Sequence, residues 1–204
     1  MLLAKICGLS EIIHVEKCIE YGASMCGFIL FYPKSHRNLS LDKAKELTSL
    51  KHSKSNVAVM VQPNNTQLES IKNLNFQYYQ IYGDQDPDEI NKIKKRYGVK
   101  IIKALTIETK EDVLKYKKYE AADIMLFDSI GKEKSLSFDH SLLKYVPTNI
   151  KKMVAGNIQI QDLEKVNKMT DIVDVSGAVE TEKKKDLNKI KEFFLKVKEI
   201  NEQN

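Results

Sequence analysis

Short runs of apolar, often branched residues alternate along this chain with longer stretches in which apolar residues recur at helical spacing. Runs of the first kind are typical of buried strands, and stretches of the second kind are typical of amphipathic helices. The pattern predicts strands at residues 2–7, 25–31, 57–61, 78–82, 100–105, 124–128, 153–155 and 172–175. It predicts helices at residues 11–21, 41–50, 66–74, 87–97, 110–119, 141–145, 161–169 and 186–200.

A chain in which each strand is followed by a helix must pair its strands in parallel, because every helix carries the chain back to the start of the next strand. Eight such units favour a closed (β/α)8 barrel, and the length of 204 residues fits one barrel domain over residues 1–204. A doubly wound open sheet is the alternative. It is disfavoured because that fold usually has fewer strands, and no Gly-x-Gly-x-x-Gly follows any early strand here.

Composition narrows the function classes. The hydrophobic fraction of 42% and the charged fraction of 30% are ordinary for a soluble globular protein, and no apolar stretch approaches the roughly 20 residues of a membrane span. The formal charge of +5 comes from lysines spread among glutamates, which argues against nucleic-acid binding but would attract a small anionic metabolite. Cys7, Cys18 and Cys26 match no common zinc pattern and cannot all pair. From this spacing we expect no metal. Cysteines that cannot all pair, with no leading signal-peptide pattern, predict a protein of the reducing cytoplasm.

In a parallel barrel the active site lies at the C-terminal ends of the strands, so residues there are the candidates for chemistry. Cys7 ends the first expected strand and is followed by Gly8, which allows a tight turn, and Asp128 ends the sixth strand. A thiolate could act as general base, and a partly desolvated carboxyl could donate a proton. The structural alternatives are that Cys7 fills the barrel mouth and that Asp128 caps a helix or forms a salt bridge.

Other residues at strand ends suit an anionic substrate. Arg37 lies in a polar loop after the second strand, where its guanidinium could bind a carboxylate or could simply be exposed. Gly156, Ser176 and Gly177 follow the seventh and eighth strands, where barrels commonly bind phosphate through backbone amides. The remaining candidates at strand ends are Tyr82, Asn157 and Asp174.

These residues, in this order and spacing, resemble phosphoribosylanthranilate isomerase of tryptophan biosynthesis. The resemblance runs through the whole chain. It rests on Lys5-Ile6-Cys7-Gly8-Leu9, Gly27-Phe28, Pro33-Lys34-Ser35-His36-Arg37, Gln80-Ile81-Tyr82-Gly83, Leu126-Phe127-Asp128-Ser129, Ser137-Phe138-Asp139, Ala155-Gly156-Asn157, Asp174-Val175-Ser176-Gly177-Ala178-Val179-Glu180 and Lys185-Asp186.

The resemblance implies a TIM barrel that catalyses a cofactor-free Amadori rearrangement of N-(5-phosphoribosyl)anthranilate to 1-(2-carboxyphenylamino)-1-deoxyribulose 5-phosphate. It implies that Asp128 is the general acid, that Cys7 is the general base, and that Arg37 binds the anthranilate carboxylate. It also implies a small phosphorylated substrate as the partner, with no nucleic acid or membrane, for a monomer or a homodimer. The resemblance further implies that the phosphate is bound by Gly156, Asn157, Ser176 and Gly177. It implies that Asp174 contacts sugar hydroxyls or neighbouring side chains.

Four departures from the family pattern accompany the resemblance. Tyr82 stands where the fourth strand normally ends in histidine, and residues 129–137 are more charged and poorer in glycine than the usual loop. Ala155-Gly156 stands for a Gly-Gly turn, and Ser176-Gly177-Ala178 stands for Ser-Ser-Gly. Backbone amides survive such changes, whereas an imidazole role at the position of Tyr82 does not.

Rival functions fit the residues less well. A related aminoaldose isomerase of histidine biosynthesis uses aspartate where this chain has Cys7, and indole-glycerol-phosphate synthase relies on lysine and glutamate on its strands. Outside enzymes, the alternative is a non-catalytic barrel that binds a phosphorylated metabolite.

Overall fold

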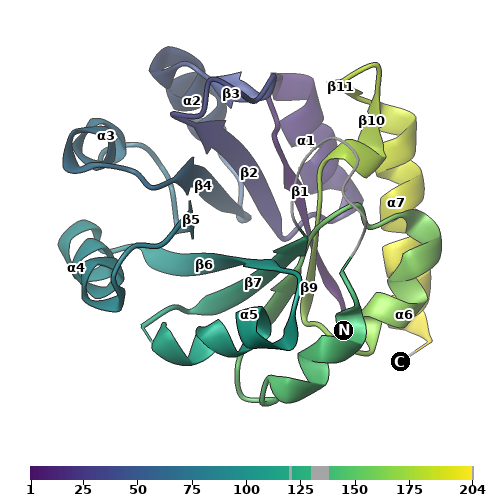
Figure 1. Ribbon diagram of the computed structural model, residues 1–204. Coiled ribbons are helices and arrows are strands. Elements are labelled where there is room, and N and C mark those ends of the chain that lie inside the picture. The colour runs from purple at the N-terminus through teal and green to yellow at the C-terminus, as the bar shows by residue number, and fades with distance from the viewer. Residues whose placement is uncertain (120, 130–137, 204) are drawn as a thin grey trace.

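Eight parallel strands close into a barrel in this computed structural model, which describes residues 1–119, 121–129 and 138–203 (Figure 1). Closure is made by β1 and β2, which pair through Lys5 with Met25, Ile6 with Cys26 and Cys7 with Gly27. The predicted (β/α)8 barrel is therefore confirmed. In ring order the strands are β1 (Leu3–Cys7), β2 (Met25–Leu30), β4 (Ser55–Val61), β5 (Tyr78–Tyr82), β6 (Lys100–Ile107), β7 (Ile124–Ser129), β8 (Lys152–Val154) and β9 (Ile172–Val175).

Helices surround the strands on the outside of the barrel (Figure 1). The α-helices are α1 (Ile12–Tyr21), α2 (Leu41–Thr48), α3 (Asn65–Ile71), α4 (Pro87–Tyr97), α5 (Lys110–Leu114), α6 (Leu163–Asn167) and α7 (Leu187–Glu202). The 3₁₀ helices are η1 (Lys115–Lys118), η2 (His140–Tyr145), η3 (Ile160–Asp162) and η4 (Gly177–Val179). In the described parts of the chain, no helix combines the length and the apolar character that a membrane span requires.

The outer elements differ from the prediction in three places. The single helices predicted at residues 110–119 and 161–169 are each divided between a short α-helix and a 3₁₀ turn, and the helix at 141–145 is 3₁₀. Short 3₁₀ pieces are common at helix ends, and apolar spacing alone does not distinguish them from α-helix. The pattern also missed the two-residue strands β3 (Asn38–Leu39), β10 (Glu180–Thr181) and β11 (Lys184–Lys185), which are too short to show a period.

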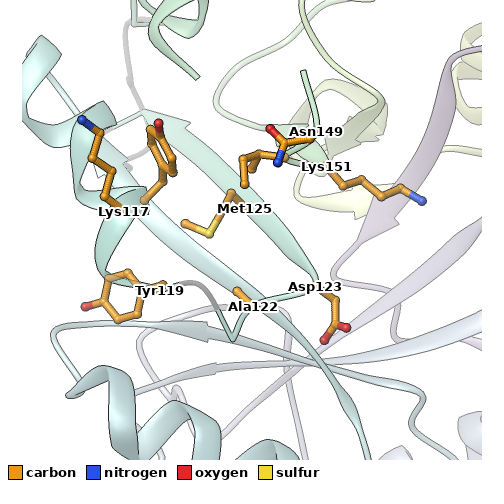
Figure 2. Close-up of a pocket in the computed structure, with 9 residues that line it drawn as sticks. Lys117, Tyr119, Ala122, Asp123, Met125, Asn149 and Lys151 are labelled. Atoms are coloured by element: carbon orange, nitrogen blue, oxygen red, sulfur yellow. The ribbon is translucent and has the colours of Figure 1, made fainter. Parts of the chain in front are cut away.

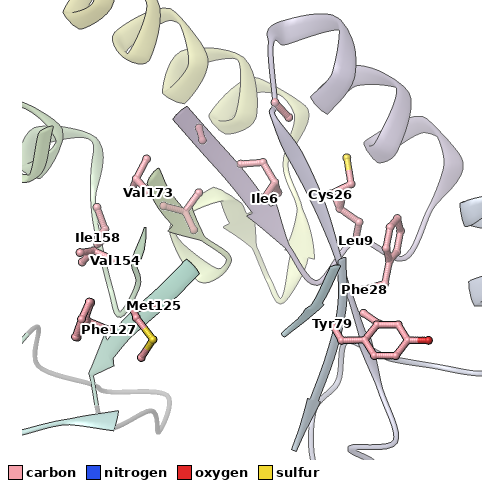
Figure 3. Close-up of a cluster of buried hydrophobic side chains, with 14 of the residues drawn as sticks. Ile6, Leu9, Cys26, Phe28, Tyr79, Met125, Phe127, Val154, Ile158 and Val173 are labelled. Atoms are coloured by element: carbon pink, nitrogen blue, oxygen red, sulfur yellow. The ribbon is translucent and has the colours of Figure 1, made fainter. Parts of the chain in front are cut away.

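Alternate residues of each strand point to opposite faces, so the barrel has two apolar layers. The inner layer fills the barrel and includes Cys7, Val59 and Leu126, while the outer layer packs strands against helices (Figure 3). The side chain of Asn201 in α7 connects the two ends of the chain. It accepts a hydrogen bond from the backbone amide of Leu2 at 2.6 Å and donates one to the backbone carbonyl of Leu2 at 3.0 Å. Because both layers hold the strands, the residues at their C-terminal ends have fixed positions.

Candidate active site

The C-terminal rim of the barrel is marked by unusual backbone geometry. Gly8, directly after β1, has a φ of 75°, and Gly156, after β8, has a φ of 98°. In the described loops that follow the strands, residues with side chains also adopt positive φ, namely Phe31 after β2, Gln62 after β4, Asn157 after Gly156, and Glu182 and Lys183 in the turn between β10 and β11. Such conformations cost roughly 1–2 kcal/mol per residue and concentrate at functional sites. The rim predicted as the active site is therefore also the part of the barrel where strain is tolerated.

Cys7 lies at this rim on the inner face of β1, two residues beyond Lys5. Lys5 is fully buried inside the barrel, and its Nζ lies 2.7 Å from Oδ2 of Asp174 on β9. Burial raises the pKa of the Cys7 thiol above its ordinary value; the ammonium groups of Lys5 and Lys185 oppose this rise, whereas Asp174 adds to it. The thiol is thus surrounded by charges that decide how readily it ionises.

Asp128 lies at the C-terminal end of β7 and faces the same space. Burial is the main cause that raises the pKa of this carboxyl to about 6, and the nearby charge of Asp174 adds to the rise. A hydrogen bond from Tyr82 Oη to Asp128 Oδ2, at 2.8 Å, lowers the pKa in part, as does Lys5. A carboxyl with such a pKa can hold a proton near neutrality, as a general acid must.

Arg37 is fixed by a partner to which sequence analysis gave no role. Its Nε and Nη2 donate to the two carboxylate oxygens of Glu180, each at 2.6 Å, and Lys185 Nζ lies 2.6 Å from Oε1 of the same carboxylate. Burial alone would raise the pKa of Glu180, but these cations hold it at about 2. Glu180 therefore stays ionised and orients the guanidinium. Its only sequence signal was its place in a segment that resembles the family.

The turn at Gly8 and the stem of Arg37 are packed together. A methyl group on Gly8 would collide with Arg37 Cδ, and Gly177 lies beside the Arg37 guanidinium, 3.7 Å from Nη2 to the position that a Cβ would take. Arg37 thus crosses from the loop after β2, over the end of β1, toward the end of β9.

Gly8→Ala is expected to lower the free energy of unfolding by roughly 1–2 kcal/mol from backbone strain and to displace Arg37. Gly98→Ala is the matched control, because Gly98 has a φ of 62° but no atom within 4 Å of its added methyl. Chemical denaturation and substrate titration should show lost stability in both variants and weakened binding only in Gly8→Ala. Unchanged binding in Gly8→Ala would contradict the inferred contact.

The small residues predicted for phosphate binding lie side by side, since β8 pairs with β9 and β9 with β1. Ser176 Oγ donates to the carbonyl of Cys7 at 2.9 Å, and Lys185 Nζ donates to the carbonyl of Ser176 at 3.0 Å. Gly177 begins η4, and a side chain at Gly156 would collide with Ser129. The structure therefore brings the loop after β9 next to Cys7 and the loop after β8 next to the end of β7.

A separate cavity of about 540 Å³ lies at the other end of the barrel (Figure 2). Its lining comes from η1, from the start of β7 and from the segment before β8, and includes Tyr116, Met125 and Lys151. Asp128 stands at the opposite end of β7, so this cavity is distinct from the candidate active site.

Comparison with known proteins identifies the family of this barrel. The sequence profile of N-(5'phosphoribosyl)anthranilate (PRA) isomerase matches residues 4–196. The chain is 32% identical to N-(5'-phosphoribosyl)anthranilate isomerase of Rhizobium johnstonii, over 97% of this chain and 94% of that protein. It is 33% identical to the Bacillus cereus protein of the same name, over 96% and 97% of the two chains. The chain belongs to the phosphoribosylanthranilate isomerase family.

Solved structures place this phosphoribosylanthranilate isomerase family member among barrels of the same form. The Thermotoga maritima enzyme superposes with a TM-score of 0.88 at 26% identity, covering 98% of this chain and 100% of that one. A second solved isomerase, described in complex with reduced 1-(o-carboxyphenylamino)-1-deoxyribulose 5-phosphate, gives a TM-score of 0.86 at 26% identity with the same coverage. The family, the isomerase class and the barrel predicted from sequence are confirmed.

Within this isomerase fold, most predicted site residues gather at one rim. The charge of Asp174 acts on both Cys7 and Asp128, while Arg37 is held by Glu180. Gly156, Asn157, Ser176 and Gly177 follow two adjacent strands. The loop at residues 129–137, which is more charged and poorer in glycine than the family pattern, lies outside the described residues except for Ser129.

Proposed function

We propose that this chain catalyses the Amadori rearrangement of N-(5'-phosphoribosyl)anthranilate to 1-(2-carboxyphenylamino)-1-deoxyribulose 5-phosphate, as a single barrel domain over residues 1–204. The observation that carries the proposal is the placement of two proton-transfer groups at one barrel rim: Asp128, at the end of β7, accepts a hydrogen bond from Tyr82 at 2.8 Å, and Cys7, at the end of β1, lies among the charges of Lys5 and Lys185. The name of its relatives and the isomerase solved with a reduced aminoketose phosphate support the substrate class.

In the proposed mechanism Asp128 gives its proton to the furanose ring oxygen as the bond from that oxygen to C1 breaks. The lone pair of the substrate nitrogen forms the C=N bond of an open Schiff base. The Cys7 thiolate then removes the proton from C2, the C–H electrons form the C1=C2 bond, and the C=N electrons return to nitrogen. The resulting enolamine tautomerises to the ketone. The step needs no electrons from outside, because the aldose carbon is reduced as C2 is oxidised.

Substrate binding is assigned to the charged and small residues around this pair. Arg37 binds the anthranilate carboxylate, because a planar guanidinium and a planar carboxylate form well-aligned hydrogen bonds. Glu180 orients the Arg37 guanidinium for this contact. Asp174, ion-paired with Lys5, contacts sugar hydroxyls and sets the charge near Cys7. The backbone amides of Gly156, Asn157, Ser176 and Gly177 hold the phosphate, which the positive ends of short helical turns favour.

Arg37→Ala is expected to raise KM at least about tenfold and to change kcat by less than about threefold, because the lost contact serves ground state and transition state alike. Arg96→Ala is the control, since Arg96 forms an exposed ion pair with Glu69 on the outside of the barrel. Steady-state kinetics checks both variants. A large loss of kcat with an unchanged KM in Arg37→Ala would contradict the binding role.

One assay tests the whole proposal. Phosphoribosylanthranilate is supplied fresh, protected from its spontaneous breakdown, and the loss of its fluorescence is followed with the purified protein. Turnover well above the uncatalysed rate is expected. A rate equal to the uncatalysed rate, in a protein that still binds the substrate, would instead indicate a non-catalytic barrel that binds phosphorylated metabolites.

A further inference from the structure

We propose that Tyr82 is a positioning residue for the acid step: its hydroxyl holds Oδ2 of Asp128, so that the carboxyl carries its transferable proton on Oδ1. The inference rests on the proposed function, in which Asp128 is the general acid. It gives a role to the residue that stands where the family pattern has histidine.

The direction of the hydrogen bonds follows from the chemistry of the groups. Tyr82 Oη lies 2.8 Å from Asp128 Oδ2, and an ionised carboxylate can only accept, so the tyrosine hydroxyl is the donor. Gln80, two residues earlier on the same inner face of β5, lies with Nε2 3.3 Å from Tyr82 Oη. Because the single hydroxyl hydrogen of Tyr82 points to Asp128, Gln80 must be the donor in this second bond.

A hydroxyl fixed in this way selects one oxygen of the carboxyl. The proton of the neutral acid avoids Oδ2, which already accepts from Tyr82, and occupies Oδ1. Orientation of a reacting group is worth a large rate factor, because a misplacement of about 1 Å can cost about 100-fold. Tyr82 thereby turns a carboxyl at a strand end into a directed proton donor.

Tyrosine differs from histidine at this position in one respect that matters for pH. Burial, and then the nearby carboxylates of Asp128 and Asp174, raise the pKa of Tyr82 well above its ordinary value. The donor therefore stays neutral wherever Asp128 titrates, and it adds no positive charge. The other groups that act on Asp128 are the carboxylate of Asp174, the ammonium of Lys5 and the backbone amide of Ser129.

Tyr82→Phe tests the inference through the titration of Asp128. Removing a hydrogen bond to the charged form is expected to raise the pKa of Asp128 by about one unit above its value of about 6, and to lower kcat about tenfold with little change in KM. Carbon-13 NMR of aspartate carboxyls, assigned by comparison with Asp128→Asn, measures the pKa directly. The limb of the kcat/KM profile that reports Asp128 should move to higher pH by the same amount.

Two further variants sharpen the test. Tyr79→Phe removes the neighbouring buried hydroxyl, which belongs to the outer layer of the same strand, and should change neither the pKa nor kcat. Tyr82→His restores a donor and should return kcat to within about threefold of wild type. It should also bring the pKa of Asp128 back to 6 or lower, because a protonated imidazole favours the carboxylate. If Tyr82→Phe does not fold, Tyr82→His still decides: a pKa of Asp128 at or below about 6 with kcat within about threefold of wild type supports the contact, and a pKa clearly above 6 overturns it.

The outcomes separate this inference from the proposed function. An unchanged Asp128 pKa and kcat in Tyr82→Phe, together with an inactive Asp128→Asn, would overturn the role of Tyr82 and leave the general acid in place. Full activity of Asp128→Asn would instead remove the acid assignment, and the positioning role with it.

Discussion

Asp128→Asn is expected to lower kcat by at least about 100-fold, because the proton that opens the sugar ring is removed while the shape of the site is kept. The asparagine carbonyl oxygen can still accept the hydrogen bond from Tyr82 that Oδ2 accepts at 2.8 Å. Steady-state kinetics with phosphoribosylanthranilate measures the effect. A rate within about threefold of wild type would refute the acid role.

The control for this variant is Asp123→Asn, just before the start of the same strand. Asp123 pairs with Lys94 Nζ at 2.9 Å and accepts from the amide of Ile101 at 2.8 Å, far from the rim that carries Asp128. Its replacement should lower stability without a loss of kcat. The two variants are thus expected to separate a loss of stability, in Asp123→Asn, from a loss of catalysis, in Asp128→Asn.

The same Asp128 variant should be more stable than wild type at neutral pH. A carboxyl with a pKa of about 6 in the folded state and 3.8 in the unfolded state binds more protons when folded, so folding stability falls as pH rises between these values. Above pH 7 the buried carboxylate costs up to about 3 kcal/mol, and at about pH 3, well below the unfolded pKa of 3.8, it costs almost nothing. Thermal unfolding should show stabilisation of Asp128→Asn at about pH 8 and none at about pH 3. Equal stability of both proteins at pH 8 would mean that the carboxyl is not destabilised by burial.

The barrel could be predicted from sequence because its signal is long-range and repeated. Eight apolar runs, each followed by a helical stretch, allow few topologies, and strand-end residues such as Cys7 and Asp128 then fall on one rim by rule. The short outer elements could be predicted less accurately from sequence. Two-residue strands such as β3 show no period, and a 3₁₀ turn shares the apolar spacing of an α-helix.

The contacts that tune the site lay beyond sequence reasoning. The pairing of Arg37 with Glu180 joins residues that are 143 positions apart, and that of Tyr82 with Asp128 joins residues 46 positions apart. Composition and spacing name the participants, but which polar group meets which depends on strand register and side-chain direction. Sequence could therefore name Tyr82 as a candidate at a strand end and as a departure from a family pattern, whereas the structure gives it a partner, Asp128.

Cys7→Ser is expected to lower kcat by at least about 100-fold, because a serine hydroxyl ionises far less readily than a thiol and cannot serve as the base. Cys26→Ser is the matched control. Cys26 lies on β2 in the outer apolar layer, where burial raises the pKa of its thiol to about 12, so its replacement should cost stability and leave kcat unchanged. Wild-type turnover in Cys7→Ser would contradict the base role.

The pH profile tests Cys7 and Asp128 together. Burial raises the pKa of Cys7, whereas the pKa of Asp128 is about 6, so between the two values the abundant form is thiol with carboxylate. The productive form, thiolate with carboxylic acid, contains the same number of protons, and its fraction is therefore constant over that interval. We expect kcat/KM to rise up to about pH 6 and then to stay level until the thiol ionises. A rate that keeps climbing about tenfold per pH unit above pH 7 would instead indicate that the thiolate acts without a protonated Asp128.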